Sequence, residues 1–98
     1  MEADKYDISN FFPIITEQSV TSGLVARVKQ RRKEQHMSQK DIARKSGVSL
    51  GSYRRFEQTG EISLQSFLRV ADTLGYLADF DSLFKYKRVI DSNGRLIP

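Results

Sequence analysis

The 98-residue sequence contains no cysteine and no tryptophan, and it has only two prolines and one histidine. Without cysteine the chain cannot form a disulfide, a cysteine-ligated zinc site, an iron–sulfur cluster or a thiol nucleophile, and a reducing compartment is expected. No apolar run approaches the ~18 residues of a membrane span, and the acidic start MEADKYD is unlike a signal peptide. We therefore expect a soluble, cytoplasmic protein that does not associate with a membrane.

The sequence also lacks the residue patterns that catalysis needs. It has no paired carboxylates inside an apolar stretch, no serine with an adjacent base and no phosphate-binding glycine loop. The single histidine, His36, lies near the end of a predicted helix, where a favourable interaction with the helix dipole is expected. DSNG, at residues 91–94, lacks the ligand spacing of a calcium loop. We expect no enzymatic activity, no cofactor and no metal site.

Positive charge is concentrated in the middle of the chain. Residues 27–55 carry ten lysines and arginines against two acidic residues, a net charge of +8. The flanking stretches are acidic, with net charges of −3 over residues 1–26 and −4 over residues 56–81. A basic block of this kind is typical of a face that binds a polyanion such as DNA, although a solvated helix surface would look similar.

The spacing of apolar residues and capping residues predicts an all-α fold of five helices followed by a C-terminal β-strand or hairpin. Alternation after residue 86 and the turn sequence DSNG indicate the strand or hairpin. The predicted organisation is an N-terminal arm (1–16), a helical domain (17–85) and a C-terminal strand or hairpin (86–98). The predicted helices run from Glu17 or Ser19 to near His36, from Ser38 to Gly47, from Ser49 to Gly60, from Ser63 to Gly75, and over residues 78–85.

Residues 39–58 have the spacing of a helix-turn-helix. Ala43 is the small residue that allows close helix contact, Gly47 ends the first helix, and Val48 fills the turn. Tyr53 and Phe56, three residues apart, are predicted to face the core together with Ile42. The opposite face of that helix then contains Leu50, Gly51, Arg54, Arg55 and Gln58.

The stretch SQKDIARKSGVSLGSYRRFEQTG followed by ISLQSFLRVADTLG resembles the phage-repressor (Cro/C1, or Xre) type of helix-turn-helix, over roughly residues 24–84. The resemblance implies a five-helix phage-repressor-like domain that binds double-stranded operator DNA. It implies a backbone phosphate contact for Gln39, base-facing positions for Leu50, Gly51, Arg54 and Arg55, and a structural ion pair between Arg32 and Glu57. Which of the two arginines reads a base stays open. The candidate DNA-binding residues are Gln39, Lys40, Arg44, Ser49, Leu50, Gly51, Ser52, Arg54 and Arg55.

Three positions depart from the family pattern. Ser46 stands where a core apolar residue is usual, Tyr53 replaces the common aliphatic residue, and EQTGE has one residue more than the usual turn. These departures bear on the tilt of the second helix of the motif.

The C-terminal region carries more apolar residues than a small domain can bury, so a homodimer is predicted. The aromatic pair Phe11 and Phe12 adds to this excess. A strand exchanged across a two-fold axis would suit residues 86–97. The candidate dimer-interface residues are Phe80, Leu83, Phe84, Val89 and Ile90.

Three functional hypotheses follow. The stretch RRFEQTGEISLQSFLRVADTLGYLADFDSLF and the C-terminal strand resemble HipB-like antitoxins, which implies an autoregulating repressor with a HipA-like kinase toxin as partner. The second hypothesis is a stand-alone phage or mobile-element repressor, and the third is a helical interaction module that does not bind DNA.

Overall fold

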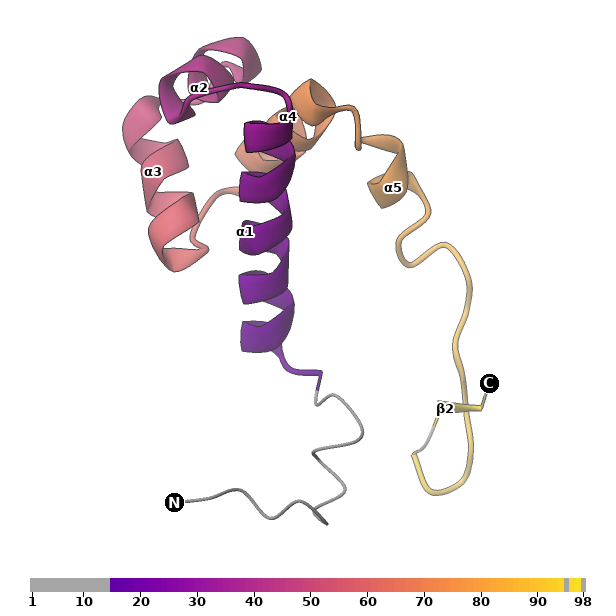
Figure 1. The fold of residues 1–98 in the computed structure, drawn as a ribbon. Helices are drawn as coiled ribbons and strands as arrows, with labels where there is room; N and C mark the ends of the chain where they lie inside the picture. Colours follow the sequence, from indigo (N-terminus) through magenta and orange to yellow (C-terminus); the bar gives the residue numbers. More distant parts are fainter. Residues whose placement is uncertain (1–14, 95, 98) are drawn as a thin grey trace, which may run out of the picture.

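A computed structural model describes residues 15–94, 96 and 97. Figure 1 shows α1 standing beside the α2–α3 pair, with α4 behind and α5 leading into an extended C-terminal segment. The predicted five helices and hairpin are confirmed, whereas the prediction for Phe11 and Phe12 lies outside the described residues. The elements are α1 (Glu17–Glu34), α2 (Gln39–Ser46), α3 (Leu50–Thr59), α4 (Leu64–Leu74), α5 (Ala78–Asp81), β1 (Val89–Ile90) and β2 (Leu96–Ile97).

Side-chain caps fix where the helices start. The predicted caps Ser38, Ser49 and Ser63 each accept a hydrogen bond from the backbone N–H three residues later. At α2 the cap is reciprocal, because the Ser38 N–H donates to Asp41 Oδ2 at 2.9 Å. Backbone and side-chain hydrogen bonds from Ser38 hold the pKa of Asp41 below its usual value. Thr16 caps α1 in the same way, which places the start of that helix at Glu17.

Helix α1 ends two residues before His36, which takes the left-handed conformation with φ of +56°. The His36 N–H donates to the Lys33 carbonyl at 3.0 Å, and the Met37 N–H donates to the Arg32 carbonyl at 3.1 Å. This is the Schellman arrangement that usually uses glycine. It turns the chain so that Met37 enters the core.

We predict that His36→Gly stabilises the protein by about 0.5 to 1 kcal/mol. Glycine adopts a positive φ without the steric strain that histidine bears, and this gain exceeds the extra entropy of the unfolded chain. Urea unfolding of the two proteins measures the difference. A less stable variant would show that the His36 side chain contributes contacts that outweigh the strain.

The core lies where α2, α3 and α4 meet the inner side of α1. Ile42, Tyr53 and Phe56 are buried as predicted for the motif, with Ala43 and Val48 beside them, and Val70 of α4 is fully buried as well. On α4, Leu64 is 73% exposed because it stands at the first turn of the helix.

The end of α3 lies so close to α1 that a side chain does not fit there. A Cβ at Gly60 would lie 2.3 Å from Thr21 Cγ2, and φ at Gly60 is +80°. The additional residue of this turn, Thr59, extends α3, and its hydroxyl donates to the Arg55 carbonyl at 2.7 Å. The same oxygen accepts from the Glu61 N–H at 3.1 Å. The longer turn is therefore ordered by Thr59.

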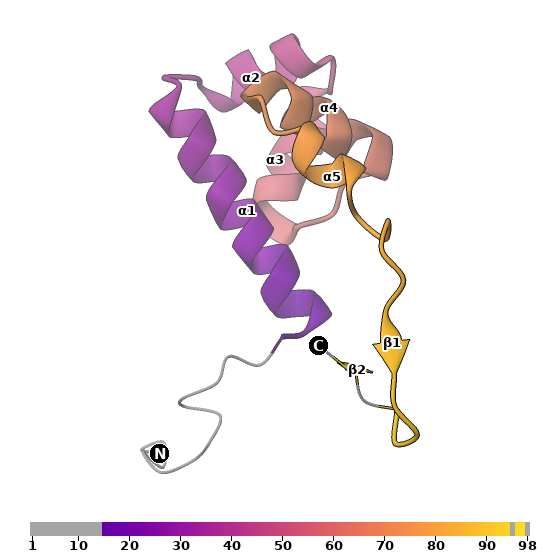
Figure 2. The same cartoon turned by 90° about the vertical axis from the view of Figure 1, so that its right-hand side faces the viewer.

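The C-terminal segment differs from the predicted one. Helix α5 ends at Asp81 instead of continuing to residue 85, and Phe84 has a φ of +62° and a fully exposed side chain. A single turn of helix gains little from its own hydrogen bonds, and i→i+3 bonds replace it here. The hairpin is present, with Val89 paired to Ile97 across the turn that DSNG forms. It lies at the end of the molecule opposite α2 (Figure 2).

Candidate nucleic-acid interface

The pair of helices α2 and α3 is joined by a turn of three residues. Gly47 takes the left-handed conformation at φ of +70°, and its neighbour's N–H bonds back to the Ala43 carbonyl at 3.0 Å. Val48, 7% exposed, fills the space under the turn. Ser46 is buried as well, and its hydroxyl donates to the Ile42 carbonyl at 2.6 Å. This bond within α2 satisfies the polar group at a position where the family usually has an apolar residue.

The predicted Arg32–Glu57 ion pair ties α1 to the end of α3. Arg32 Nε donates to Glu57 Oε2 at 2.9 Å, and the two side chains are 8% and 5% exposed. Arg32 also donates to the Met37 carbonyl at 2.9 Å. The Tyr53 hydroxyl donates to the same carboxylate, and Gln39 Nε2 donates to its other oxygen at 2.9 Å. All three helices α1, α2 and α3 therefore meet at one buried carboxylate.

This network shifts the pKa values of its members. Burial alone would raise the pKa of Glu57, but hydrogen bonds from Arg32, Tyr53 and Gln39 outweigh it and hold the pKa below its usual value. Burial raises the pKa of Tyr53, and the hydrogen bond to Glu57 raises it further. Burial opposes the charge of Arg32, yet its partner Glu57 keeps its pKa above the ordinary value. The pair is therefore ionised at neutral pH, and the tyrosine is neutral.

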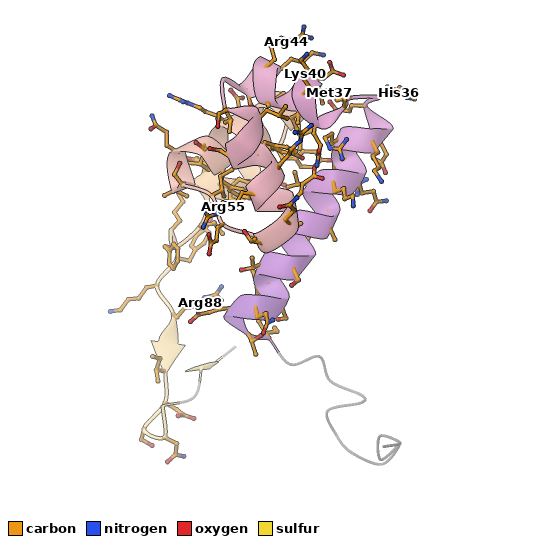
Figure 3. All side chains as sticks on the ribbon, turned by 90° about the vertical axis from the view of Figure 1, so that its left-hand side faces the viewer. His36, Met37, Lys40, Arg44, Arg55 and Arg88 are labelled. Atoms are coloured by element: carbon orange, nitrogen blue, oxygen red, sulfur yellow. The ribbon has the colours of Figure 1, made fainter. Side chains whose placement is uncertain are left out.

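The outer face of α2 and α3 is basic. Lys40, Arg44, Arg54 and Arg55 are exposed, and so are Gly51 and Ser52 between them. Figure 3 shows Lys40 and Arg44 on α2 at the top of the view and Arg55 lower down on α3, whereas Arg88 lies on the C-terminal segment. We call the four cations Lys40, Arg44, Arg54 and Arg55 the basic face. Arg44 approaches Asp41 only to 3.6 Å, so its guanidinium stays available to solvent.

Two candidate DNA-binding residues, Leu50 and Ser49, contact other parts of the protein in this structure. Leu50 is half-buried and packs against the core, so it does not lie wholly on the outer face. This follows from its place in the first turn of α3, next to Val48. The hydroxyl of Ser49 accepts from the Ser52 N–H at 3.1 Å and donates to the Ser52 hydroxyl at 2.8 Å. Ser49 therefore acts as the cap of α3 in this structure.

The two adjacent arginines of α3 have different neighbours. Arg54 Nε donates to Gln39 Oε1 at 3.3 Å, across to α2. Arg55 Nε donates to Glu61 Oε2 at 2.8 Å, in the loop after α3. The Glu61 contact was not predicted, because an acidic residue six positions on in a loop has no fixed spacing that would reveal it. The two guanidinium groups therefore start from different environments.

The two helices α2 and α3 and the helices around them match a known protein family. The family model HTH_3, described as helix-turn-helix, matches residues 28–80, which is more than half of the chain. The chain belongs to this helix-turn-helix family. It is accordingly a DNA-binding protein of the transcription-regulator class. No curated protein sequence matches the chain.

The HTH_3 match contains all nine candidate DNA-binding residues and both members of the buried ion pair. It ends at Phe80, so the exposed residues Leu83, Phe84, Val89 and Ile90 lie beyond it. Within residues 15–94, 96 and 97, no cluster of three histidines and acidic residues could hold a metal ion. In the same part of the chain, no helix is both long and apolar enough to cross a bilayer.

We predict that Glu61→Gln raises the affinity for duplex DNA about 2- to 5-fold. The exposed Arg55–Glu61 pair contributes little to stability, so its loss frees the guanidinium for DNA at small cost. Fluorescence anisotropy with a labelled duplex measures the change. Asp72→Asn, an exposed residue on α4, is the matched charge control. An equal gain in both variants would show that net charge alone is responsible.

Proposed function

We propose that the protein is a sequence-specific transcriptional repressor whose α3 reads operator DNA in the major groove. The observation that carries this proposal is the arrangement of Arg54 and Arg55 on the outer side of a helix whose inner side is locked by Tyr53 and Phe56. Arginine forms two hydrogen bonds to the edge of guanine and also binds phosphate. The first turns of α2 and α3 add backbone N–H groups that favour phosphate. The proposal assigns the chain no catalytic role and a cytoplasmic location.

The proposed form on DNA is a homodimer bound to two half-sites about 34 Å apart, one turn of the double helix. Four predicted interface residues, Leu83, Phe84, Val89 and Ile90, are 57 to 101% exposed, which supports a partner for the C-terminal segment. The fifth, Phe80, is half-buried and packs edge-on against Phe67 with ring centroids 5.4 Å apart. Phe80 therefore belongs to the domain itself.

The more specific proposal is an autoregulating antitoxin with a HipA-like kinase toxin as partner. Its support is the resemblance of residues 54–84 to HipB-like antitoxins and the exposed apolar C-terminal segment, which offers a surface to a protein partner. Co-expression with each neighbouring gene and affinity purification tests it. A stable complex with a toxic neighbour is expected. Without such a complex, the stand-alone repressor would be the better description.

The antitoxin and the stand-alone repressor both require binding to operator DNA. Binding to the DNA upstream of the protein's own gene tests this shared requirement. Footprinting should show protection of a two-fold symmetric site, and sedimentation should give two chains per duplex. A protein that protects no site, or that binds all duplexes equally, would instead be a helical interaction module.

A further inference from the structure

Gln39, the first residue of α2, uses both ends of its side-chain amide in the free protein. Its Nε2 donates to Glu57 Oε1 at 2.9 Å, and its Oε1 accepts from Arg54 Nε at 3.3 Å. Only one orientation of the amide fits these neighbours. The reverse orientation would place two oxygens against each other at Glu57 and two donors against each other at Arg54. The environment of Gln39 therefore aims its carbonyl oxygen at the arginine.

We propose that Gln39 is a positioning residue for Arg54 in DNA recognition, an inference that rests on the proposed DNA-binding function. The buried carboxylate of Glu57 holds the amide, and the amide holds Arg54 through its Nε–H. The two terminal amino groups of Arg54 form no hydrogen bond within the described part of the chain. Those two groups form the fork that binds O6 and N7 of guanine together. Gln39 thereby makes Arg54 the arginine that reads a base.

Glu57, which holds the Gln39 amide, is itself fixed because it lies at the centre of the ion-pair network. Its side chain is 5% exposed, and it accepts hydrogen bonds from Arg32 on α1 and Tyr53 on α3 as well as from Gln39. An arginine held in place before binding loses less side-chain entropy when it meets DNA. Arg55 differs, because its anchor Glu61 is a 62% exposed loop residue. The structure thus favours Arg54 over Arg55 as the base reader.

A phosphate contact and a positioning role for Gln39 predict different couplings. If Gln39 acts through Arg54, Gln39→Ala should lower the affinity for a duplex that the wild-type protein selects by about 3- to 10-fold. The same substitution should not lower the affinity further in a protein that already carries Arg54→Ala. If Gln39 only binds phosphate, the same fold-loss should appear in both backgrounds and on every duplex. Lys40, its exposed neighbour without a link to Arg54, is the matched control.

The experiment uses the full chain and a duplex that the wild-type protein selects from a random-sequence library. Dissociation constants are measured for wild type, Gln39→Ala, Arg54→Ala and the double variant, and for the corresponding set with Lys40→Ala. The expected result is that Gln39→Ala/Arg54→Ala binds like Arg54→Ala alone, whereas Lys40→Ala multiplies with Arg54→Ala. Multiplication in the Gln39 set as well would overturn the positioning role. Failure of the wild type to select any duplex would instead overturn the proposed DNA-binding function.

A second measurement without DNA keeps the result independent of folding defects. In the free wild-type protein, the Arg54 Nε–H should exchange with solvent more slowly than the Nε–H of Arg44, which donates no hydrogen bond to any residue that the structure describes. Gln39→Ala should abolish this difference, because it removes the oxygen that accepts from the Arg54 Nε–H. Unchanged exchange at Arg54 in Gln39→Ala would contradict the proposal.

Discussion

Replacing Glu57 by alanine is expected to lower the free energy of unfolding by about 3 to 5 kcal/mol. The substitution leaves the guanidinium of Arg32 buried at 8% exposure without its counter-ion. It also removes the acceptor of the Tyr53 hydroxyl and of the Gln39 amide. A loss of this size is a large part of the 5 to 15 kcal/mol that stabilises a typical domain, so the variant should be partly unfolded at 37 °C. Urea unfolding followed by circular dichroism measures the change.

The control is a more exposed ion pair on α1, the helix that carries Arg32. Arg31 and Glu34 are 35% and 50% exposed, and Glu34→Ala should lower the free energy of unfolding by less than about 1 kcal/mol. Replacing the buried group as a whole, with Arg32→Met, Tyr53→Phe and Glu57→Met, should restore much of the stability, since no buried charge is left unpaired. If Glu57→Ala and Glu34→Ala lower the free energy of unfolding by similar amounts, the buried ion pair contributes no more to stability than the exposed one.

The contribution of the Arg32–Glu57 pair to the free energy of unfolding should also depend on pH. The pKa of Glu57 is below its ordinary value of 4.5 in the folded protein, so its contribution is fully present above pH 4.5 and disappears as the pH falls through the folded-state pKa. The stability difference between wild type and Glu57→Gln should therefore shrink below pH 4.5. Asp41, whose pKa is also lowered, is present in both proteins and cancels.

Arg54→Ala should weaken binding to the selected duplex by about 1 to 3 kcal/mol and relax the preference for the base that it reads. Arg54 is exposed, and its terminal amino groups form no hydrogen bond within the described part of the chain, so alanine removes both of the proposed base contacts. Binding to the selected duplex and to single-base variants of it measures both effects. Arg55→Ala should weaken binding with a smaller loss of base preference, because its partner Glu61 is an exposed loop residue and does not hold the guanidinium in one place before binding.

Lys40→Ala is the control for a contact without base preference. It should weaken binding to all duplexes alike and reduce the salt dependence by about one phosphate contact. An equal loss on matched and mismatched duplexes for Arg54→Ala would contradict its role as a base reader.

Much of the fold could be predicted because local rules and burial agree along most of the chain. Serine caps and glycine stops set the ends of α2, α3 and α4, and Tyr53 and Phe56 are buried as their spacing indicates. The Arg32–Glu57 pair, which the family resemblance implies, is also present. In these segments the sequence period, the caps and the core all favour the same structure.

The remainder depends on contacts between residues far apart in the sequence or on weak local preferences. The bond from Gln39 to Glu57 joins residues 18 positions apart, and neither side chain alone indicates the other. Helix α5 stops early because one turn of helix is marginal by itself, so apolar spacing at Leu83 and Phe84 could not decide its length. His36 ends α1 in a conformation that its residue type rarely adopts.

The most direct test of the central claim is the salt dependence of binding to the selected duplex and to a scrambled duplex of equal length. The logarithm of the association constant should fall linearly with the logarithm of salt concentration, with a slope of about −0.9 for each phosphate neutralised. At physiological salt the selected duplex should still bind at least about 10³-fold more tightly than the scrambled one. An affinity that does not change with salt, or that is equal for both duplexes, would contradict recognition of DNA by the basic face.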